Sequence, residues 1–298
     1  MKINRSELEK IVKMTQMELK GYVVEELKQN GYDVAVGDGY VYAKGTEPYL
    51  LTAHLDTVHE KKRGMPKQIN YEKKNGKTIM SSPQGIGADD RGGVYAVLEL
   101  MRDFHATILF CEDEEIGSKG AAKFVNTEHI FDLCDLNYLI QIDRRGSHDA
   151  VFYECGNKEF QKFIEDNTDF VKAYGSWTDI CELSPECDVA SVNFSTGYYD
   201  EHTVQETLVL EELEHTIEQV RHLLCVECKP FDYQERKAYG NLFDYYEDDY
   251  DIFGVSYKED DDITYDEAEG ESLEVAMLHF LIEHPTVCWN DIINLEKY

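Results

Sequence analysis

Two neighbouring acids, Asp89 and Asp90, lie in the stretch Gly85-Ile86-Gly87-Ala88-Asp89-Asp90-Arg91-Gly92-Gly93. They follow a glycine-rich turn and come directly before an apolar run from Val94 to Met101. Carboxylates so close to a buried segment are unfavourable unless positive charge lies nearby. We expect a pair of divalent metal ions to supply this charge, with further ligands from other stretches of the chain.

Composition excludes several classes of protein. At 298 residues the chain can hold one large domain or two smaller ones, and its net charge of −31 disfavours nucleic acid and anionic membranes as partners. No apolar run approaches the roughly 20 residues that span a bilayer. Residues 1–20 have the pattern of a charged amphipathic helix and not of a secretory signal. Eight unevenly spaced cysteines are not typical of a disulfide scaffold, so we expect a cytoplasmic protein.

Apolar strands alternate with amphipathic helices over much of the chain. Strands are expected at 32–36, 40–43, 49–53, 78–81, 106–111, 138–142, 150–153 and 189–194, and helices at 6–30, 92–104, 119–125, 159–166 and 208–226. Ser6 is the expected N-cap of the first helix, and 60–77 is expected to be a surface excursion. The alternation predicts an α/β fold, a three-layer sandwich with a mostly parallel central sheet.

Several polar side chains follow expected strands directly. These are His54, Glu114–Glu115 and Asp143. In parallel sheets ligands gather at the carboxyl ends of strands. Together with Asp89 and a later histidine, His202, these residues form a set of imidazoles and carboxylates that suits zinc, manganese or cobalt.

Spacing suggests roles within this set. His54 and Asp56 are two residues apart on an extended segment, so they project to one side, where one can ligate while the other orients it. Glu114 and Glu115 are adjacent and diverge, so one can bind metal while the other acts as a general base. Two divalent ions would be balanced by Asp89, Glu115, Asp143 and a bridging hydroxide, which leaves Glu114 available to take a proton from water.

Five motifs occur in a fixed order, and together they carry a family resemblance. They are His54-Leu55-Asp56-Thr57-Val58, Gly87-Ala88-Asp89-Asp90-Arg91-Gly92-Gly93, Asp113-Glu114-Glu115-Ile116-Gly117-Ser118, Ile142-Asp143 and Thr196-Gly197-Tyr198-Tyr199-Asp200-Glu201-His202. Over roughly residues 50–225 the sequence resembles the co-catalytic two-zinc exopeptidases, the group that includes peptidase T, the aminoacylase and carboxypeptidase G relatives and the glutamyl aminopeptidases.

The resemblance implies a metal site. One ion would be held by His54 and Asp143 and the other by Glu115 and His202, with Asp89 bridging them. Asp56 would orient His54, and Glu114 would be the base and proton shuttle. Asp90, by contrast, is expected to be an acid at a helix N-terminus. An aspartate at the position of Asp143 goes more with aminopeptidases than with acylases and carboxypeptidases.

The sequence also departs from the family. Many relatives carry an inserted lid or dimerisation domain, but only 58 residues separate Asp143 from His202, so that domain is expected to be missing. Arg144 and Arg145 match no family motif; Arg144 is a candidate for binding a substrate carboxylate, and a surface pair is the alternative. Asp179, in Trp177-Thr178-Asp179, is a candidate for supporting the metal ligands from behind.

Other features are expected to be structural. The remaining histidines (His59, His105, His129, His148, His215, His222, His279 and His284) are interpreted as structural or surface residues. Cys225 and Cys228 form a single Cys-x-x-Cys motif. Without a second such motif, it is not expected to bind zinc. Residues 1–229 are the expected catalytic domain without a lid. Residues 230–298 are an expected acidic, tyrosine-rich extension that covers or partners it, with two short helices in residues 272–298.

The leading interpretation is a cytosolic two-metal metallopeptidase that uses activated water on small peptides, most simply an aminopeptidase or a di- or tripeptidase. Zinc is the expected metal, with cobalt or manganese also possible. The alternatives are a deacylase of N-acyl amino acids and a non-catalytic acidic interaction protein on the same fold. The sequence leaves the oligomeric state open.

Overall fold

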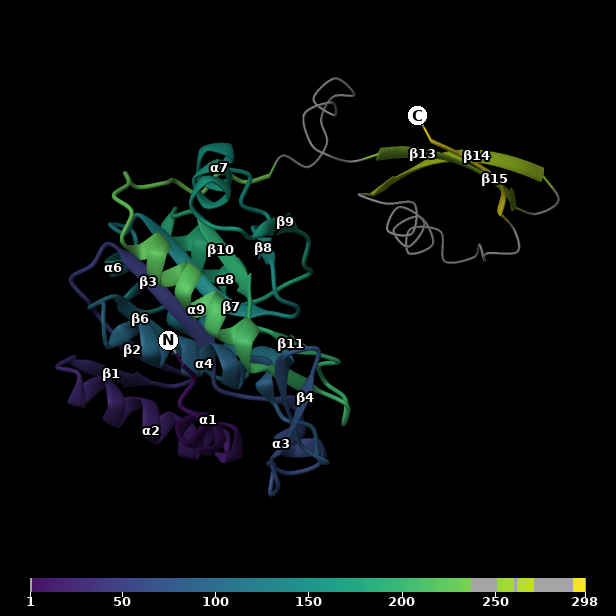
Figure 1. Cartoon of the computed structure of the whole chain (residues 1–298). Coiled ribbons are helices and arrows are strands. Elements are labelled where there is room, and N and C mark those ends of the chain that lie inside the picture. The colour runs from purple at the N-terminus through teal and green to yellow at the C-terminus, as the bar shows by residue number, and fades with distance from the viewer. Residues whose placement is uncertain (1, 237–250, 260–261, 271–291, 298) are drawn as a thin grey trace. The chain divides into compact units, whose positions relative to one another are not determined.

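A computed structural model describes residues 2–236, 251–259, 262–270 and 292–297. The chain divides into two compact units, Met1–Arg236 and Lys237–Tyr298. All the candidate site residues lie in the first unit. Figure 1 shows the helices and strands of this unit. Among the described residues, no helix is both long enough and apolar enough to cross a bilayer.

The first unit is built on an eight-stranded sheet with the strand order β1-β2-β6-β3-β7-β10-β8-β9. Its strands are β1 (Val34–Gly37), β2 (Tyr40–Ala43), β3 (Tyr49–His54), β6 (Thr107–Cys111), β7 (Tyr138–Arg144), β8 (Asp149–Val151), β9 (Val171–Ala173) and β10 (Ser191–Ser195). The four central strands, β6, β3, β7 and β10, are parallel to one another, whereas β1, β2 and β8 join by antiparallel pairing.

Helices cover both faces of this sheet. The helices of the first unit are α1 (Arg5–Lys13), α2 (Gln16–Gln29), α3 (Val58–Lys62), α4 (Ala88–Met101), α5 (Lys119–Phe124), α6 (Ile130–Leu133), α7 (Lys158–Asn167), α8 (Asp179–Cys187) and α9 (Leu210–Leu224). Helices α1, α4 and α9 pack together on one face, and α5, α6 and α8 on the other (Figure 1).

Two hydrophobic clusters lie on opposite faces of the sheet. Alternate residues of β6 divide between them, with Ile108 and Phe110 in one cluster and Leu109 and Cys111 in the other. This period of two places every second side chain on each face, so a strand covered on both sides reads as a continuous apolar run. The expected three-layer α/β sandwich is confirmed.

A second, antiparallel sheet has the strand order β11-β12-β5-β4. Its strands are β4 (Asn70–Lys74), β5 (Lys77–Ser81), β11 (Tyr198–Tyr199) and β12 (Thr207–Val209). The stretch 60–77 is largely exposed, as expected of a surface excursion, but it also contains β4, a strand that the sequence did not predict. Asn75 and Gly76 both have positive φ, at 52° and 83°, which suits the tight turn of a β4–β5 hairpin.

The expected single helix over 6–30 is also wrong, because the chain forms α1 and α2 with a break at Met14 and Thr15. Thr15 accepts a hydrogen bond from the Glu18 N–H, and the Glu18 side chain accepts one from the Thr15 N–H. This capping box starts a new helix. The N-cap of α1 is Asn4 and not Ser6.

In the second unit, β13 (Asp251–Glu259) pairs antiparallel with β14 (Asp262–Gly270) and with β15 (Ile292–Lys297). The helix expected to reach the C-terminus is therefore wrong over 292–297. The remainder of the two helices expected in 272–298, including their break at Pro285, lies outside the described residues. The first unit extends through Arg236, somewhat beyond the boundary expected after residue 229.

Candidate active site

Three neighbouring parallel strands, β6, β3 and β7, place the candidate site at the edge of the sheet where their carboxyl ends lie. His54 is the last residue of β3, and Asp143 lies near the end of β7. Glu114 and Glu115 lie in a short 3-10 helix, η1 (Glu114–Ile116), that follows β6. Because β3 pairs in parallel with both β6 and β7, residues distant in the sequence meet at the carboxyl ends of these strands.

The glycine-rich stretch brings Asp89 to the same edge. Gly87 has a φ of 64°, and the peptide bond between Asp89 and Asp90 is cis. A Cβ atom at Gly93 would lie 2.0 Å from the carbonyl oxygen of Ile142, so only glycine lets α4 pass this close to β7.

Asp90 follows Asp89 directly, but its carboxylate accepts hydrogen bonds from the backbone. Its Oδ1 accepts a hydrogen bond from the Gly93 N–H at 3.0 Å, and its Oδ2 accepts one from the His54 N–H at 3.1 Å. The side chain thus caps the start of the regular part of α4 and ties it to the end of β3. The expectation that Asp90 is an acid at a helix N-terminus is confirmed.

The carboxylate of Asp89 lies between two histidines. Its Oδ1 is 3.1 Å from Nε2 of His54, and its Oδ2 is 3.2 Å from Nε2 of His202. Asp143 Oδ1 lies 3.4 Å from the same nitrogen of His54. Glu115 Oε2 lies 2.9 Å from Nε2 of His202. The five candidate ligands therefore form two groups that share Asp89.

Asp56 and Glu114 flank this cluster. Asp56 Oδ1 is 3.2 Å from the second ring nitrogen of His54, Nδ1. The Asp56 carboxylate also accepts the backbone N–H groups of Glu114 at 2.9 Å and of Glu115 at 3.1 Å. The side chain of Glu114 lies close by, with Oε2 3.9 Å from His54 Nε2. Asp56 thus fixes both a histidine and the segment that carries the two glutamates.

Asp143 is held from several sides. Its Oδ2 accepts hydrogen bonds from Thr178 Oγ1 at 2.9 Å and from Gln141 Nε2 at 3.2 Å. The hydroxyl of Tyr198 donates to its backbone carbonyl at 3.0 Å. These donors fix the carboxylate and leave its Oδ1 facing His54, as expected of a preorganised ligand.

Asp179 lies behind the site, buried at the start of α8. No N–H or O–H group among the described residues donates to its carboxylate, although the Cys111 thiol interacts with it weakly. Burial raises the pKa of Asp179 to about 7, with the charge on Asp143 adding to the shift and His54 opposing it. Asp179 thus influences the site electrostatically without reaching the cleft.

Several buried carboxylic acids lie close together in the metal-free protein, and they shift one another's pKa values. Burial raises the pKa of Glu114 to about 9 and that of Asp143 to about 6. Hydrogen bonds to Asp89 and Glu115 raise the pKa of His202 to about 10. Burial works to lower the pKa of His54, but the carboxylates around it, Asp143 first, raise it well above its usual range. The site holds protons because it lacks enough positive charge of its own.

The donor set fits divalent metal ions. Ligand atoms of His54, Asp89 and Glu115 lie within 4.8 Å of one another, and so do those of His54, Asp90 and Asp143. Bonds of about 2.1 Å in a tetrahedral zinc site separate ligand atoms by about 3.4 Å, close to the contacts that Asp89 makes. Glu115 Oε1 is buried and has no hydrogen-bond partner among the described residues. Cations between these groups would satisfy both the charge and the unpaired oxygen.

A cleft opens over this cluster. Four candidate ligands, Asp89, Glu115, Asp143 and His202, line it together with Glu114, Arg144, Arg145, Tyr153, Trp177, Tyr198 and Glu201. Arg144 Nε pairs with Asp149 at 3.1 Å, and Arg145 pairs with Glu201 at 3.2 Å. Trp177 is 52% exposed. The two arginines thus reach the cleft wall while each is held by an acid.

The sequence interpretation missed Glu206. Its fully buried carboxylate accepts the N–H groups of Gly87 at 3.0 Å and Asp89 at 3.1 Å, and it also pairs with Nε2 of His59. His59 is buried, so interpreting it as structural was correct, but its partner lies 147 positions away. The only local signal is an acid four residues after His202, which belongs to none of the five motifs.

The residues between Asp143 and His202 build no separate body. They form β8, α7, β9, α8, β10 and β11, all within the first unit. That an inserted lid domain is missing stays a prediction.

Comparisons with known proteins agree with this architecture. Residues 40–182 match the model of peptidase family M28, whereas no curated protein sequence matches the chain. The aminopeptidase PepT from Bacillus cereus ATCC 10987 aligns with a TM-score of 0.58 and 15% identity, over 74% of this chain and 96% of that chain.

Two further solved structures are similar. The TET1 peptidase of Pyrococcus horikoshii aligns with a TM-score of 0.56 and 16% identity, over 74% of this chain and 98% of that chain. A Zn-dependent exopeptidase from Parabacteroides distasonis ATCC 8503 aligns with a TM-score of 0.53 and 15% identity, over 75% and 98%. At such identities the structural likeness establishes the fold.

Proposed function

We propose that the protein is a two-metal aminopeptidase of the peptidase family M28 type acting on small peptides, a proposal supported by the match of residues 40–182 to the model of that family. The observation that carries the proposal is the position of Asp89, whose two carboxylate oxygens face different histidines at 3.1 and 3.2 Å. A carboxylate so placed can bridge two ions.

In this proposal each ion has two ligands besides the bridge. His54 and Asp143 would hold one ion, Glu115 and His202 would hold the other, and Asp89 would be shared by both. Zinc suits these imidazoles and carboxylates best, with cobalt or manganese as further candidates. When bound, the ions would polarise the scissile carbonyl and make water more acidic.

Glu114 serves as the general base and acid. It lies beside the ligand cluster but faces the cleft, so its carboxylate can take a proton from the attacking water and deliver it to the leaving amine. Its pKa of about 9 in the metal-free protein falls when cations bind nearby. Asp56 holds His54 through Nδ1 and leaves Nε2 free to ligate.

An acidic cleft favours a substrate with a free amine. Glu114, Glu115 and Glu201 all line it, and a peptide ammonium would be attracted by these carboxylates. We propose that the exposed ring of Trp177 contacts the first side chain of the peptide and that Arg144 contacts a carboxylate further along. Similar structures include an aminopeptidase PepT and a tripeptidase from Staphylococcus aureus, which agrees with a short peptide substrate.

The test is the purified chain loaded with zinc and offered di- and tripeptides, beside Glu114→Gln. We expect Glu114→Gln to lower kcat by about 10²–10⁴-fold while metal content stays the same, since the residue is not a proposed ligand. The control is Asp113→Asn, on the neighbouring residue, which has a positive φ of 59° that asparagine tolerates. Metal-loaded protein whose kcat is unchanged by Glu114→Gln would defeat the mechanism.

Adding N-acetylated amino acids to this panel separates two other functions. Hydrolysis of N-acetylated amino acids with none of free peptides would replace the aminopeptidase by a deacylase. Hydrolysis of neither substrate by the zinc-loaded chain would favour a non-catalytic interaction protein.

We propose that residues 1–229 hold all the catalytic residues and that residues 230–298 are an acidic extension, whose first residues, 230–236, complete the fold of the catalytic unit. Asp232 and Glu235 form β-bridges with Val189 and Cys155. We also propose a cytosolic location, since all the cysteines in the described part of the chain are free thiols.

A further inference from the structure

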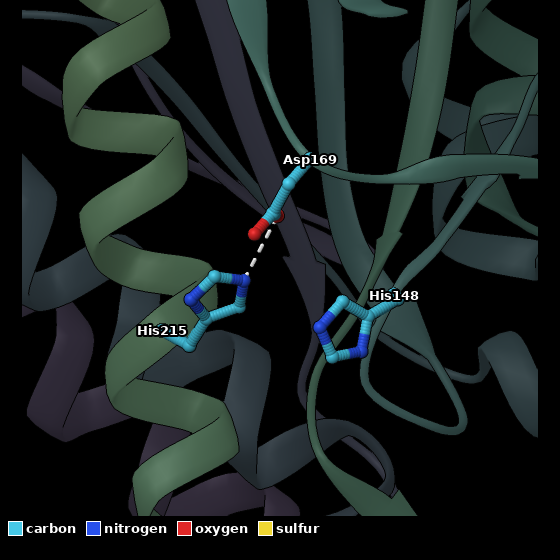
Figure 2. A group of neighbouring side chains, drawn as sticks. All are labelled: His148, Asp169 and His215. Carbon is cyan, nitrogen blue, oxygen red and sulfur yellow. Dashed lines mark hydrogen bonds and ion pairs between the residues drawn. The ribbon is translucent and has the colours of Figure 1, made fainter.

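A second group of metal-binding side chains lies outside the candidate active site. His148, Asp169 and His215 come from the turn between β7 and β8, from the segment between α7 and β9, and from α9 (Figure 2). Each offers one ligand atom, and these atoms lie within 4.8 Å of one another. None of the three residues lines the cleft. The group is therefore physically separate from the proposed peptidase site.

Two of the three side chains are already in contact. Nε2 of His215 lies 2.9 Å from Oδ1 of Asp169. The rings of His148 and His215 face each other with centroids 5.2 Å apart and an interplanar angle of 36°. Ligand atoms around a tetrahedral zinc ion lie about 3.4 Å apart, so Asp169 and His215 need little movement to share an ion, and the ring of His148 must move closer to them.

His148 presents a free nitrogen to this gap. Its Nδ1 is hydrogen-bonded to Ser147 Oγ at 2.7 Å. Figure 2 shows its other ring nitrogen on the side of the ring that faces His215 and Asp169. A hydrogen bond at one imidazole nitrogen fixes the ring and leaves the other to ligate, the arrangement common at metal-binding histidines.

The backbone around the group is held in place. The Val171 N–H donates to the His148 carbonyl at 2.7 Å, and the Asp169 N–H donates to Gln219 Oε1, on α9, at 3.1 Å. Between them Phe170 is buried and packs on the ring of His215 with centroids 6.1 Å apart. The three ligand-bearing segments thus hold fixed positions before any ion binds, which reduces the entropy cost of binding.

Two imidazoles and one carboxylate suit zinc and neighbouring transition metals, and not calcium or magnesium, which prefer oxygen ligands. We propose that His148, Asp169 and His215 form an additional, exchangeable zinc-type site that clamps the β8–β9 edge of the sheet to α9. Three protein ligands leave one position for water. The net charge of −31 raises the local concentration of cations.

The proposal is tested by metal content in the full-length chain. Wild type, His148→Ala and Asp169→Asn are dialysed against the same buffered free zinc and analysed for zinc per chain. The matched control is His222→Ala, which removes an exposed histidine of the same helix, α9. We expect both site variants to bind one ion fewer than wild type and than His222→Ala. Equal zinc in all four proteins would overturn the proposal.

Thermal unfolding provides a second readout. Because an ion that binds only the folded state stabilises it, zinc should raise the Tm of wild type more than that of either site variant. Equal shifts would contradict the clamp. Peptide hydrolysis at saturating zinc should be the same in all four proteins. A chain that fails to hydrolyse peptides but still shows the difference in zinc content would refute the proposed function and retain this site.

Discussion

At the level of single residues, Glu206 holds the glycine turn that carries Asp89. Its carboxylate accepts two backbone N–H groups of that turn, and its partner His59 lies 2.9 Å from an Arg63 nitrogen through Nδ1. The same Arg63 nitrogen donates to the carbonyl of His202 at 3.4 Å. One network, buried at Glu206 and His59 and exposed at Arg63, thus connects the proposed bridging residue with a ligand of the second ion.

We expect Glu206→Gln to weaken zinc binding at the active site by about 10–100-fold. The N–H groups of Gly87 and Asp89 now donate to different oxygens of the Glu206 carboxylate, and in the variant one of these oxygens is replaced by an NH₂ group, which cannot accept. Zinc affinity by competition with a chelator, measured beside kcat/KM, checks this. Excess zinc should restore much of the activity, which loss of a catalytic residue would not permit. Gln205→Ala, at the exposed neighbouring position, is the control. An unchanged affinity in Glu206→Gln would contradict the role.

Asp179 makes the metal-free protein sensitive to pH. Its pKa is about 7 in the folded state against an ordinary 3.8, so between these values the folded state holds a proton that the unfolded state has lost. Stability therefore falls as pH rises through this window, by at most about 1.4 kcal/mol per pH unit for one proton. Above about pH 7 this loss is complete.

Asp179→Asn should remove this contribution. We expect the metal-free variant to lose less stability than wild type between about pH 4.5 and about pH 8, and to be the more stable protein at about pH 8. These two values span about two pH units or more of the range in which only the folded state holds the Asp179 proton. Urea unfolding at a series of pH values measures it, with exposed Asp135→Asn as the reference. Parallel curves for wild type and Asp179→Asn would contradict the assignment.

At the level of elements, the break between α1 and α2 comes from side-chain capping. Thr15→Ala removes the acceptor for the Glu18 N–H, so we expect a loss of about 1 kcal/mol in the free energy of unfolding. Ser6→Ala, inside α1 and exposed, should change it by less than about 0.5 kcal/mol. Urea titration of both variants decides between Thr15 and Ser6 as caps, and a larger effect at Ser6 would contradict the structure.

The central strands were predictable from the sequence because each is buried on both faces, which makes its apolar run continuous. The second sheet was not, because β5 pairs with β12 across more than a hundred residues. The β4–β5 hairpin had a local signal in Asn75-Gly76, but the polar strand β4, with four of its five residues exposed, lacked the apolar alternation that marks a half-buried strand.

At the level of the whole molecule, the segment after residue 229 is part of the first unit. Phe231 is buried against Phe160 with ring centroids 5.3 Å apart, and its carbonyl accepts the Ala190 N–H at 2.8 Å. The proline at 230 and the acidic residues beyond it suggested an earlier boundary, because composition does not reveal which apolar residue returns to the core.

A chain ending at Arg236 should keep metal binding and peptide hydrolysis, since all candidate site residues lie in the first unit. A chain ending at Lys229 should be less stable by about 3 kcal/mol or more, the usual cost of removing a buried aromatic side chain. Thermal unfolding and kcat/KM of the two truncated proteins, beside the full chain, measure this. Equal stability of the two would place the boundary at residue 229 instead.

The sequence by itself determined the layered α/β architecture and the motifs of the candidate site, because buried strands and strand-end ligands leave local patterns. Only the tertiary structure decided which side chains meet. It placed the Asp89 carboxylate between His54 and His202, which lie far apart in the sequence. It also paired Glu206 with the glycine turn and brought His148 to His215. Such contacts join segments far apart in the chain, so no local pattern records them.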